Sequence, residues 1–172
     1  MRRYLLSLGS SLGNRKYNLF TARNYIEEDL GDIEALSQIF YSEPWGGVAK
    51  NEFYNQSLIL RTRLSPPELV YALQDIEEKM GRVRRIRWED RIIDIDIILY
   101  KNEYGISVAI DTSYLKIPHP KLKERSFMWA PSVQIASDWI HPEYGVSLKE
   151  LFPADDFGSG EGFLKDTPLV LS

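Results

Sequence analysis

The stretch from Ile92 to Tyr100 reads I-I-D-I-D-I-I-L-Y, an apolar run of strand length that contains two acids, Asp94 and Asp96. Successive residues of a strand point to opposite faces of its sheet, so every second residue shares a face. The pattern therefore predicts one face with Ile93, Ile95, Ile97 and Leu99, and another with Ile92, Asp94, Asp96, Ile98 and Tyr100. Two carboxylates that point the same way from an apolar strand repel each other and lose hydration. We expect a positive partner, either a metal ion or an arginine, opposite them.

Five arginines lie just upstream, in the segment G-R-V-R-R-I-R-W-E-D-R that begins at Gly81: Arg82, Arg84, Arg85, Arg87 and Arg91. Guanidinium groups bind phosphate oxygens, and carboxylates are oxygen ligands for Mg²⁺. Acids that hold Mg²⁺ beside arginines that hold oxyanions are typical of phosphoryl-type transfer on a polyphosphate. A structural ion-pair network or a solvated loop is the alternative, and for any one arginine it is the better explanation. Five arginines beside a same-face acid pair favour the functional interpretation.

The composition limits the class of protein. With 172 residues and 44% hydrophobic content, the chain suits one domain, expected over residues 1–152, followed by an acidic, glycine-rich extension over 153–172 that we expect to be mobile. A net charge of −4 argues against general binding of nucleic acid. The absence of cysteine excludes disulfides and thiolate chemistry. No stretch has the apolar length of a membrane span, so we expect a cytoplasmic protein, acting as a monomer without a membrane partner.

The periodicity predicts the order strand, helix, strand, strand, helix, strand. The expected ranges are Arg3–Leu8, a helix over Arg15–Asp29, Ile33–Ser42, Phe53–Arg63, a helix from the N-cap Ser65 to Gly81, and the acidic strand. This order is typical of an α+β, ferredoxin-like βαββαβ sandwich, with helices packed on an antiparallel sheet. Beyond it we expect a short edge hairpin over Tyr104–Ile110 and helical pieces over Pro120–Ala136.

Three further positions are candidates for ligand contact. Phe53 and Asn55 share one face of a predicted strand and would offer an aromatic plane and an amide to a flat heterocycle. Phe127 could stack from the opposite side. His119 lies between prolines in I-P-H-P and is interpreted as a phosphate or nucleotide contact rather than a base. The alternatives are a core phenylalanine, a turn asparagine and a structural histidine.

Four motifs occur together in this chain: G-S-S-L-G-N, F-Y-N-Q-S, R-W-E-D-R-I-I-D-I-D-I-I-L-Y and I-P-H-P-K-L-K-E-R-S-F-M. With them, the chain from about Tyr4 to Phe152 resembles the 6-hydroxymethyl-7,8-dihydropterin pyrophosphokinases. The resemblance implies transfer of the β,γ-pyrophosphoryl group of ATP to the hydroxymethyl oxygen of the pterin, with release of AMP, as a step of folate biosynthesis.

The resemblance also implies a role for each matching position. Asp94 and Asp96 would bind two Mg²⁺ ions, and Arg82 and Arg91 would stabilise charge on the moving group. The residues implied to hold ATP are Arg84, Arg87, Trp88, His119 and Arg125. Those implied to hold the pterin are Glu43, Pro44, Gly46, Phe53, Asn55 and Phe127, although Glu43 stands where the family often has threonine. Glu77 matches a recurrent family position with no role assigned.

Two other classes of function fit the same residues. One is a ferredoxin-like module that binds nucleic acid or an effector through its arginines and aromatics without catalysis. The other is a different Mg²⁺-dependent nucleotidyl transferase on a similar sandwich. The small product discriminates between the transferases, because AMP indicates pyrophosphoryl transfer whereas ADP or pyrophosphate indicates another reaction.

Overall fold

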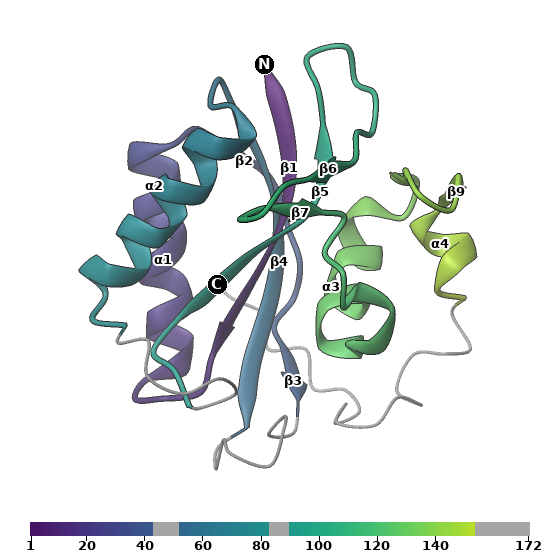
Figure 1. Ribbon diagram of the computed structural model, residues 1–172. Coiled ribbons are helices and arrows are strands. Elements are labelled where there is room, and N and C mark those ends of the chain that lie inside the picture. The colour runs from purple at the N-terminus through teal and green to yellow at the C-terminus, as the bar shows by residue number, and fades with distance from the viewer. Residues whose placement is uncertain (43–51, 83–89, 154–172) are drawn as a thin grey trace.

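A five-stranded antiparallel sheet forms the centre of the part of the chain that the structure, a computed structural model, describes: residues 1–42, 52–82 and 90–153 (Figure 1). Its strands are β1 (Arg2–Ser10), β2 (Asp32–Leu36), β3 (Phe40–Ser42), β4 (Phe53–Thr62) and β5 (Asp94–Lys101). The order across the sheet is β2-β4-β1-β5, and β3 also pairs with β4. Strand β5, which carries the two acids, therefore ends this order and has one paired neighbour in it, β1.

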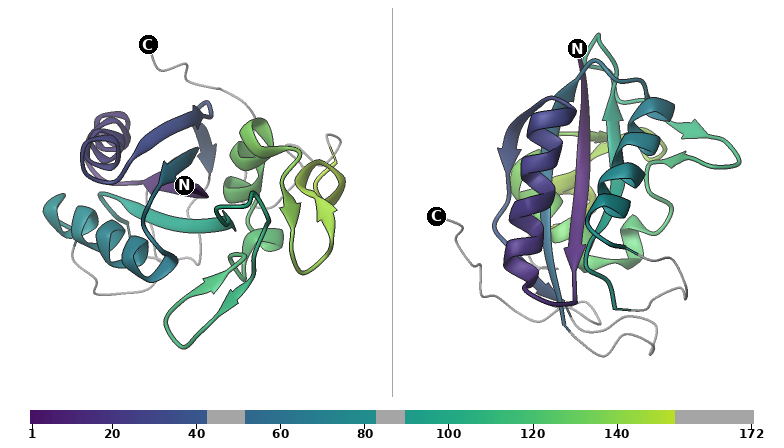
Figure 2. Two further views of the ribbon diagram at one scale, coloured as in Figure 1. Left: turned by 90° about the horizontal axis from the view of Figure 1, so that it is seen from above. Right: turned by 90° about the vertical axis from the view of Figure 1, so that its left-hand side faces the viewer.

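Helices cover both faces of the sheet (Figures 1 and 2). On one face lie α1 (Arg15–Asp29) and α2 (Pro66–Lys79), and on the other lies α3 (Ser126–Ala136), which follows the short 3-10 helix η1 (Leu122–Glu124). The remaining elements are the pair β6 (Ile110–Asp111) and β7 (Lys116–Ile117), the pair β8 (Ile140–His141) and β9 (Val146–Ser147), and α4 (Leu148–Leu151). The chain is thus α+β with an antiparallel sheet, as predicted. No helix of the described residues is both long and apolar enough to cross a membrane.

The two long helices begin and pack as the sequence predicts. In α1, the buried residues are Leu19, Ala22 and Ile26, and the Asn14 side chain accepts a hydrogen bond from the backbone of the first turn. In α2, Ser65 and Glu68 form the predicted capping box. The helix ends at Lys79, and Gly81, which follows the C-cap Met80, has a φ of +86° that only glycine adopts readily. These local signals fix where α2 ends, and hence where the arginine segment begins.

A bulge in β5 changes the predicted assignment of faces. Leu6 pairs with Ile97 but Leu5 pairs with Leu99, so Ile98 is an additional residue on β5. Ile93, Ile95 and Ile97 lie in the core beneath α1 and α2, as predicted, whereas Leu99 lies with Ile98 in the core beneath α3. Tyr100 lies in the opposite core, where its ring stacks on Tyr4 at 4.8 Å between centroids. The predicted faces of Leu99 and Tyr100 were therefore wrong, as was that of Ile92, which packs against the first core.

Two other predictions of local structure need correction. The single strand expected over Ile33–Ser42 is two strands, because the chain leaves the sheet after β2, where the Ser37 hydroxyl accepts a hydrogen bond from the Ser57 amide at 2.9 Å. The hairpin expected over Tyr104–Ile110 forms later, between β6 and β7. Within the expected range, Ser107 makes an isolated bridge to Lys101. The helical pieces expected over Pro120–Ala136 are present as η1 and α3.

Candidate active site

The face of the sheet beneath α3 changes from apolar to polar along the strands. Two rows cross three strands at the polar end. In one row Gly9 on β1 lies between Asn55 on β4 and Asp94 on β5, and in the other Ser7 lies between Ser57 and Asp96. Paired residues of antiparallel strands project from the same face, so Asp94 and Asp96 point the same way, as predicted. Helix α3 reaches the second row, where the hydroxyl oxygens of Ser57 and Ser132 lie 3.1 Å apart.

The Asp94 carboxylate is neutralised by two arginines. Arg82 Nη1 donates to Asp94 Oδ1 at 2.7 Å, and Arg91 Nη1 donates to Asp94 Oδ2 at 2.8 Å. The backbone of Arg91 is held in turn by Ser11, the residue after β1, because the Arg91 amide donates to the Ser11 hydroxyl at 2.8 Å and the Arg91 carbonyl accepts from the Ser11 amide at 2.8 Å. The positive partner that the sequence requires is thus an arginine pair at Asp94.

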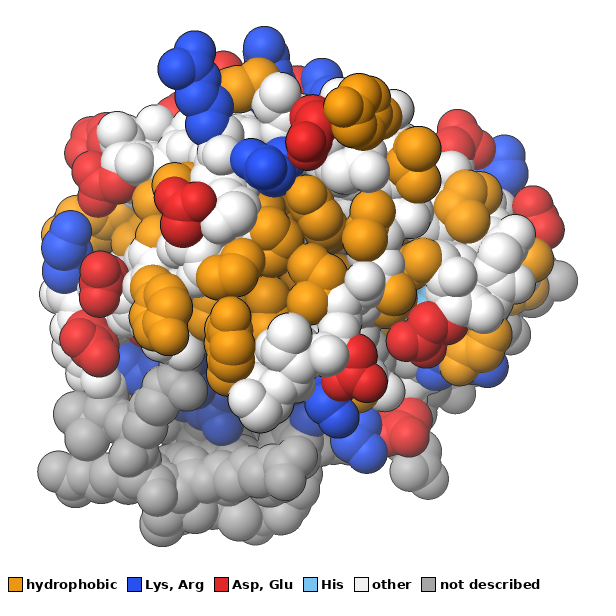
Figure 3. All heavy atoms as spheres, turned by 45° about the horizontal axis from the view of Figure 1, so that its top comes forward, with side chains coloured by type: hydrophobic (Ala, Val, Ile, Leu, Met, Phe, Trp, Pro, Cys, Tyr) orange, Lys and Arg blue, Asp and Glu red, His pale blue; other side chains and the backbone are white. Residues whose placement is uncertain are grey.

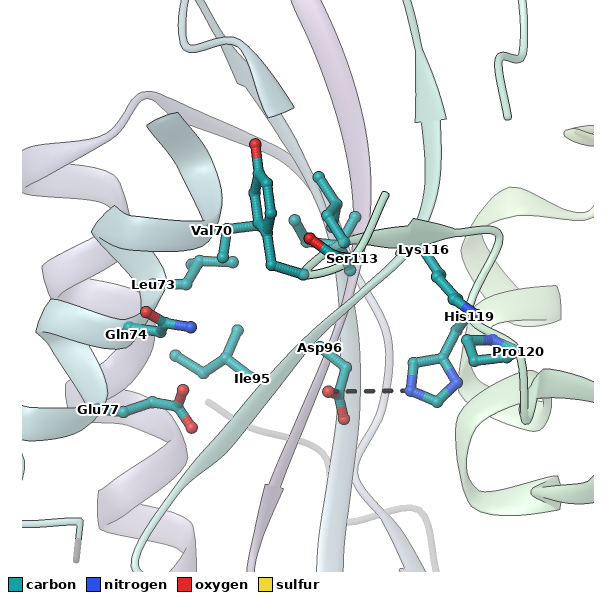
Figure 4. A pocket seen from close by; sticks show the side chains of 13 residues that line it. Val70, Leu73, Gln74, Glu77, Ile95, Asp96, Ser113, Lys116, His119 and Pro120 are labelled. Atoms are coloured by element: carbon teal, nitrogen blue, oxygen red, sulfur yellow. Dashed lines mark ion pairs between the residues drawn. The ribbon is translucent and has the colours of Figure 1, made fainter. Parts of the chain in front are cut away.

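Asp96 has a different environment, although it is only two residues away. Burial and, after it, the neighbouring charge of Asp94 together raise the pKa of its carboxyl from 3.8 to about 7. His119 lies beside it, with Nε2 3.9 Å from Asp96 Oδ1, and the dashed line in Figure 4 joins the two side chains. The positive charge that surrounds Asp96 is therefore too little to offset its desolvation, and a cation beside it would be stabilised.

His119 is held as a neutral imidazole. Its Nδ1 accepts a hydrogen bond from the Lys121 amide at 3.1 Å, and its own amide donates to the Ile98 carbonyl at 3.0 Å. Burial, with help from the charge of Arg125, lowers the pKa of His119 to about 4. Since Nδ1 is an acceptor, the ring proton lies on Nε2, on the side of Asp96. A neutral ring fits a hydrogen-bonding role better than that of a proton acceptor.

These side chains meet in a pocket of about 320 Å³ at the β5 edge. It brings together all six predicted catalytic and ATP-binding positions that the structure describes: Arg82, Arg91, Asp94, Asp96, His119 and Arg125. A second pocket, of about 370 Å³, shares Glu77, Ile95, Asp96, His119 and Pro120 with the first. In Figure 4 its wall from α2 (Val70, Leu73, Gln74 and Glu77) faces Lys116, His119 and Pro120 across β5. Apolar side chains dominate the middle of the face shown in Figure 3.

The three predicted pterin positions that the structure describes, Phe53, Asn55 and Phe127, lie outside both pockets, on the α3 side of the sheet. Asn55 is buried in β4, and Phe53 begins that strand. A Cβ at Gly9 would lie 3.2 Å from Asn55 Oδ1 and 3.5 Å from Phe53 Cδ1, so the absence of a side chain there leaves room for both. Phe127 lies in the first turn of α3, with the Arg125 guanidinium 5.9 Å from its ring centroid. The other predicted positions, Glu43, Pro44, Gly46, Arg84, Arg87 and Trp88, lie outside the described residues, as does the extension from residue 154.

The carboxylates of Asp94 and Asp96 fit a hard cation that is also coordinated by oxygens of a substrate. Among the described residues, no group of three or more histidine, cysteine or acidic side chains lies close enough together to enclose an ion. Two carboxylates alone suffice for Mg²⁺, which keeps several waters and commonly binds through one or two carboxylates together with substrate phosphates. Burial and the charge of Asp94 raise the pKa of Asp96, so a cation bound beside this carboxylate would relieve an unfavourable charge. The residues therefore fit Mg²⁺ on a phosphorylated ligand.

The structure places Glu77, whose role the resemblance leaves open, in the site, and it adds other residues that the sequence did not identify. Glu77 is buried in α2 and contacts Arg82, and Lys121 lines the smaller pocket. The signal for Glu77 was an acid next to the apolar stripe of a helix, adjacent to the buried Ile76. Four more residues with polar side-chain groups line the larger pocket: Gln74, Ser113, Tyr114 and Lys116. No motif marks these positions: Gln74 lies on α2, and the fold of the β6–β7 segment brings the other three beside that helix.

Comparisons with known proteins show that the chain is similar to pyrophosphokinases. The chain is 40% identical over 148 residues to the 2-amino-4-hydroxy-6-hydroxymethyldihydropteridine pyrophosphokinase of Aquifex aeolicus, which covers 86% of this chain and 89% of that protein. It is 34% identical over 141 residues to the enzyme of the same name from Porphyromonas gingivalis, covering 80% and 92%.

The family model described as 7,8-dihydro-6-hydroxymethylpterin-pyrophosphokinase matches residues 5–137. The chain belongs to this family. Among solved structures, Plasmodium falciparum HPPK-DHPS shares the fold, with a TM-score of 0.68 at 16% identity. The match covers 92% of this chain and 44% of that one, so the chain spans less than half the length of this two-part relative.

Proposed function

We propose that this protein transfers the β,γ-pyrophosphoryl group of ATP to the hydroxymethyl oxygen of 6-hydroxymethyl-7,8-dihydropterin, releasing AMP, in folate biosynthesis. One observation carries the proposal beyond family membership. Two same-face carboxylates, Asp94 and Asp96, share one pocket with the guanidiniums of Arg82, Arg91 and Arg125. A polyphosphate needs this combination, because metal-bound oxygens and arginine-bound oxygens together spread the charge of the group in transfer.

Asp94 and Asp96 are the proposed ligands of two Mg²⁺ ions. When bound, the ions neutralise the triphosphate and polarise the phosphorus that is attacked. The carboxylates hold that charge at a fixed place on a sheet edge rather than on a loop. This rigidity supports alignment of the pterin oxygen with the β-phosphorus, and alignment accounts for much of the rate in reactions of this kind.

Arg82 and Arg91 are proposed to stabilise the negative charge of the transferred group. Both guanidiniums donate hydrogen bonds to the Asp94 carboxylate, so both are close to the place where the phosphates must bind. His119 and Arg125 are proposed to contact the remaining phosphate or nucleotide atoms, together with Arg84, Arg87 and Trp88. The larger pocket would take the nucleoside, since its wall combines the apolar Val70, Leu73 and Ile97 with polar groups such as Gln74 and Ser113.

The pterin is proposed to lie between Phe53 and Phe127, with Asn55 bonded to its polar edge and with further contacts from Glu43, Pro44 and Gly46. Support comes from the row Asn55, Gly9 and Asp94, which leads across the sheet from the proposed pterin site to the proposed metal site. Two flat rings and a buried amide suit a heterocycle that has both donors and acceptors.

We further propose a single catalytic domain over residues 1–152 with the extension as an appendage, working as a cytoplasmic monomer. A ferredoxin-like arrangement is proposed for the core. The strand order β2-β4-β1-β5 and the element order β1, α1, β2, β4, α2, β5 support it.

The test is an incubation of the protein with ATP, Mg²⁺ and the hydroxymethyl dihydropterin, followed by separation of the nucleotides. AMP is expected in a 1:1 ratio with the pterin diphosphate, and none is expected when the pterin is omitted. Asp96→Asn serves as a matched control that keeps the shape of the side chain. Release of ADP or of free pyrophosphate would contradict the proposal.

A further inference from the structure

A buried ion-pair chain links α2 to the site. Arg82 Nη1 contacts Glu77 Oε2 on one side and Asp94 Oδ1 on the other. The side chains of Glu77 and Arg82 are only 3% and 10% exposed, whereas that of Asp94 is 24% exposed. One guanidinium is thus shared between a deep carboxylate and a shallower one that faces the pocket.

The two arginines on Asp94 are held differently. Arg82 follows α2 directly, and its amide donates to the Glu77 carbonyl at 3.0 Å, so the same residue fixes both its backbone and its side chain. The backbone of Arg91 is held by Ser11, and its guanidinium forms an ion pair with Asp94. A charge that neutralises Asp94 would therefore leave Arg82 anchored and release the guanidinium of Arg91.

A cation that binds Asp94 must compete with both guanidiniums. Each carboxylate oxygen of Asp94 already accepts from an arginine, at 2.7 and 2.8 Å. If Glu77 takes part of the interaction with Arg82, the attraction between Arg82 and Asp94 is weaker and the cation meets less competition. Removal of the charge of Glu77 would strengthen the attraction between Arg82 and Asp94.

We propose that Glu77 is a positioning residue that acts through Arg82: it withdraws the guanidinium from Asp94 when a divalent cation arrives and keeps it beside the transferred group. The inference rests on the proposed function and deepens it. Burial of a charged pair costs desolvation, so a buried carboxylate at this place is better explained by control of Arg82 than by stability of α2.

The test uses the full chain and four forms: wild type, Glu77→Gln, Arg82→Gln and the double variant. The affinity for Mn²⁺ alone is measured from the electron paramagnetic resonance signal of the free ion. Glu77→Gln is expected to weaken Mn²⁺ binding by about tenfold, equivalent to about 1.4 kcal/mol. Arg82→Gln is expected to strengthen binding, and Glu77→Gln should have no further effect once Arg82 is absent.

Independent, additive effects of the two substitutions would overturn the proposal, because Glu77 would then not act through Arg82. If Glu77→Gln does not fold, Mn²⁺ binding to Arg82→Gln that is no tighter than to wild type overturns it alone. Turnover is measured in parallel. If wild type forms AMP but Glu77 and Arg82 show no coupling, this inference fails and the proposed function stands. If the two residues are coupled but no AMP forms, the proposed function fails while the effect of Glu77 on cation binding stands.

Discussion

Asp94 and Asp96 lie two residues apart on β5, yet the environments of their carboxylates differ. Asp94 has a guanidinium on each oxygen, whereas Asp96 faces a neutral histidine at 3.9 Å. The sequence predicts that both acids point to one face and that arginines lie nearby. It does not predict which acid the arginines neutralise, because that depends on how α2 ends and on how the Ser11 turn holds Arg91.

The raised pKa of Asp96 predicts a pH-dependent stability. Its folded pKa of about 7 lies above the ordinary value of 3.8, so between these pH values the folded state binds more protons, and the free energy of unfolding falls as the pH rises. Without added metal, Asp96→Asn should be more stable than wild type by about 2 kcal/mol at pH 8, allowing for screening of a partly exposed group, and equal to it at pH 4. Urea unfolding at both pH values measures this. An equal difference at pH 4 and pH 8 would contradict the assignment.

Removal of either acid should stop the reaction without unfolding the protein. We expect Asp94→Ala and Asp96→Ala each to lower kcat by at least about 100-fold, because each loses charge that holds the metal against the phosphates. Steady-state kinetics measure the loss, and circular dichroism checks the fold. Near-normal kcat in either variant would remove that residue from the proposed metal site.

At the scale of elements, α2 connects the stability of the fold to the geometry of the site. Its first turn is fixed by the Ser65 and Glu68 capping box, and its other end carries Glu77 into the pocket. We expect Ser65→Ala to cost about 1 kcal/mol and to lower Tm by about 2 to 4 °C, measured by thermal unfolding. Ser65→Asp keeps a capping oxygen and is the control. If the aspartate variant lost as much stability as the alanine variant, the cap would not be the cause.

The close approach of β1 and β4 at Gly9 leads to a second prediction at this scale. A Cβ there would approach Asn55 Oδ1 to 3.2 Å and would push the amide by a few tenths of an ångström. We expect Gly9→Ala to raise KM for the pterin by about tenfold, since small displacements of a positioning group weaken binding strongly, while KM for ATP stays near its wild-type value. Steady-state kinetics with each substrate varied separately would show the split, and an equal rise in both constants would refute it.

Helices were easier to predict than the irregular parts of the sheet. The limits of α1 and the cap of α2 follow from residues that are neighbours in sequence, such as Asn14, Ser65 and Glu68. The bulge at Ile98 follows from the register with β1, and the break after Leu36 follows from bonds to Ser57, so both depend on partners distant in sequence. The larger pocket was also missed, because its wall from the β6–β7 segment meets α2, which is distant in sequence, and that segment carries no motif of its own.

For the whole molecule, the fold and the site are expected to be separable. The two apolar cores lie on either side of the sheet, and neither needs a metal ion for its packing. We therefore expect a chelator such as EDTA to abolish turnover while leaving Tm at its value without ligand. Mg²⁺ with a non-hydrolysable ATP analogue should raise Tm by mass action. A loss of cooperative unfolding in EDTA would show that the metal is structural instead.

The pairing of Asp94 with Asp96 as a metal site is tested most directly by counting ions. Mn²⁺ is titrated into the complex of the protein with a non-hydrolysable ATP analogue, and the bound ion is counted from the loss of its free resonance signal. Wild type is expected to bind two Mn²⁺ per chain, in excess of that bound by the nucleotide alone at the same concentration. The double variant Asp94→Asn, Asp96→Asn should bind no more than the nucleotide does. An unchanged count in the double variant would contradict the account.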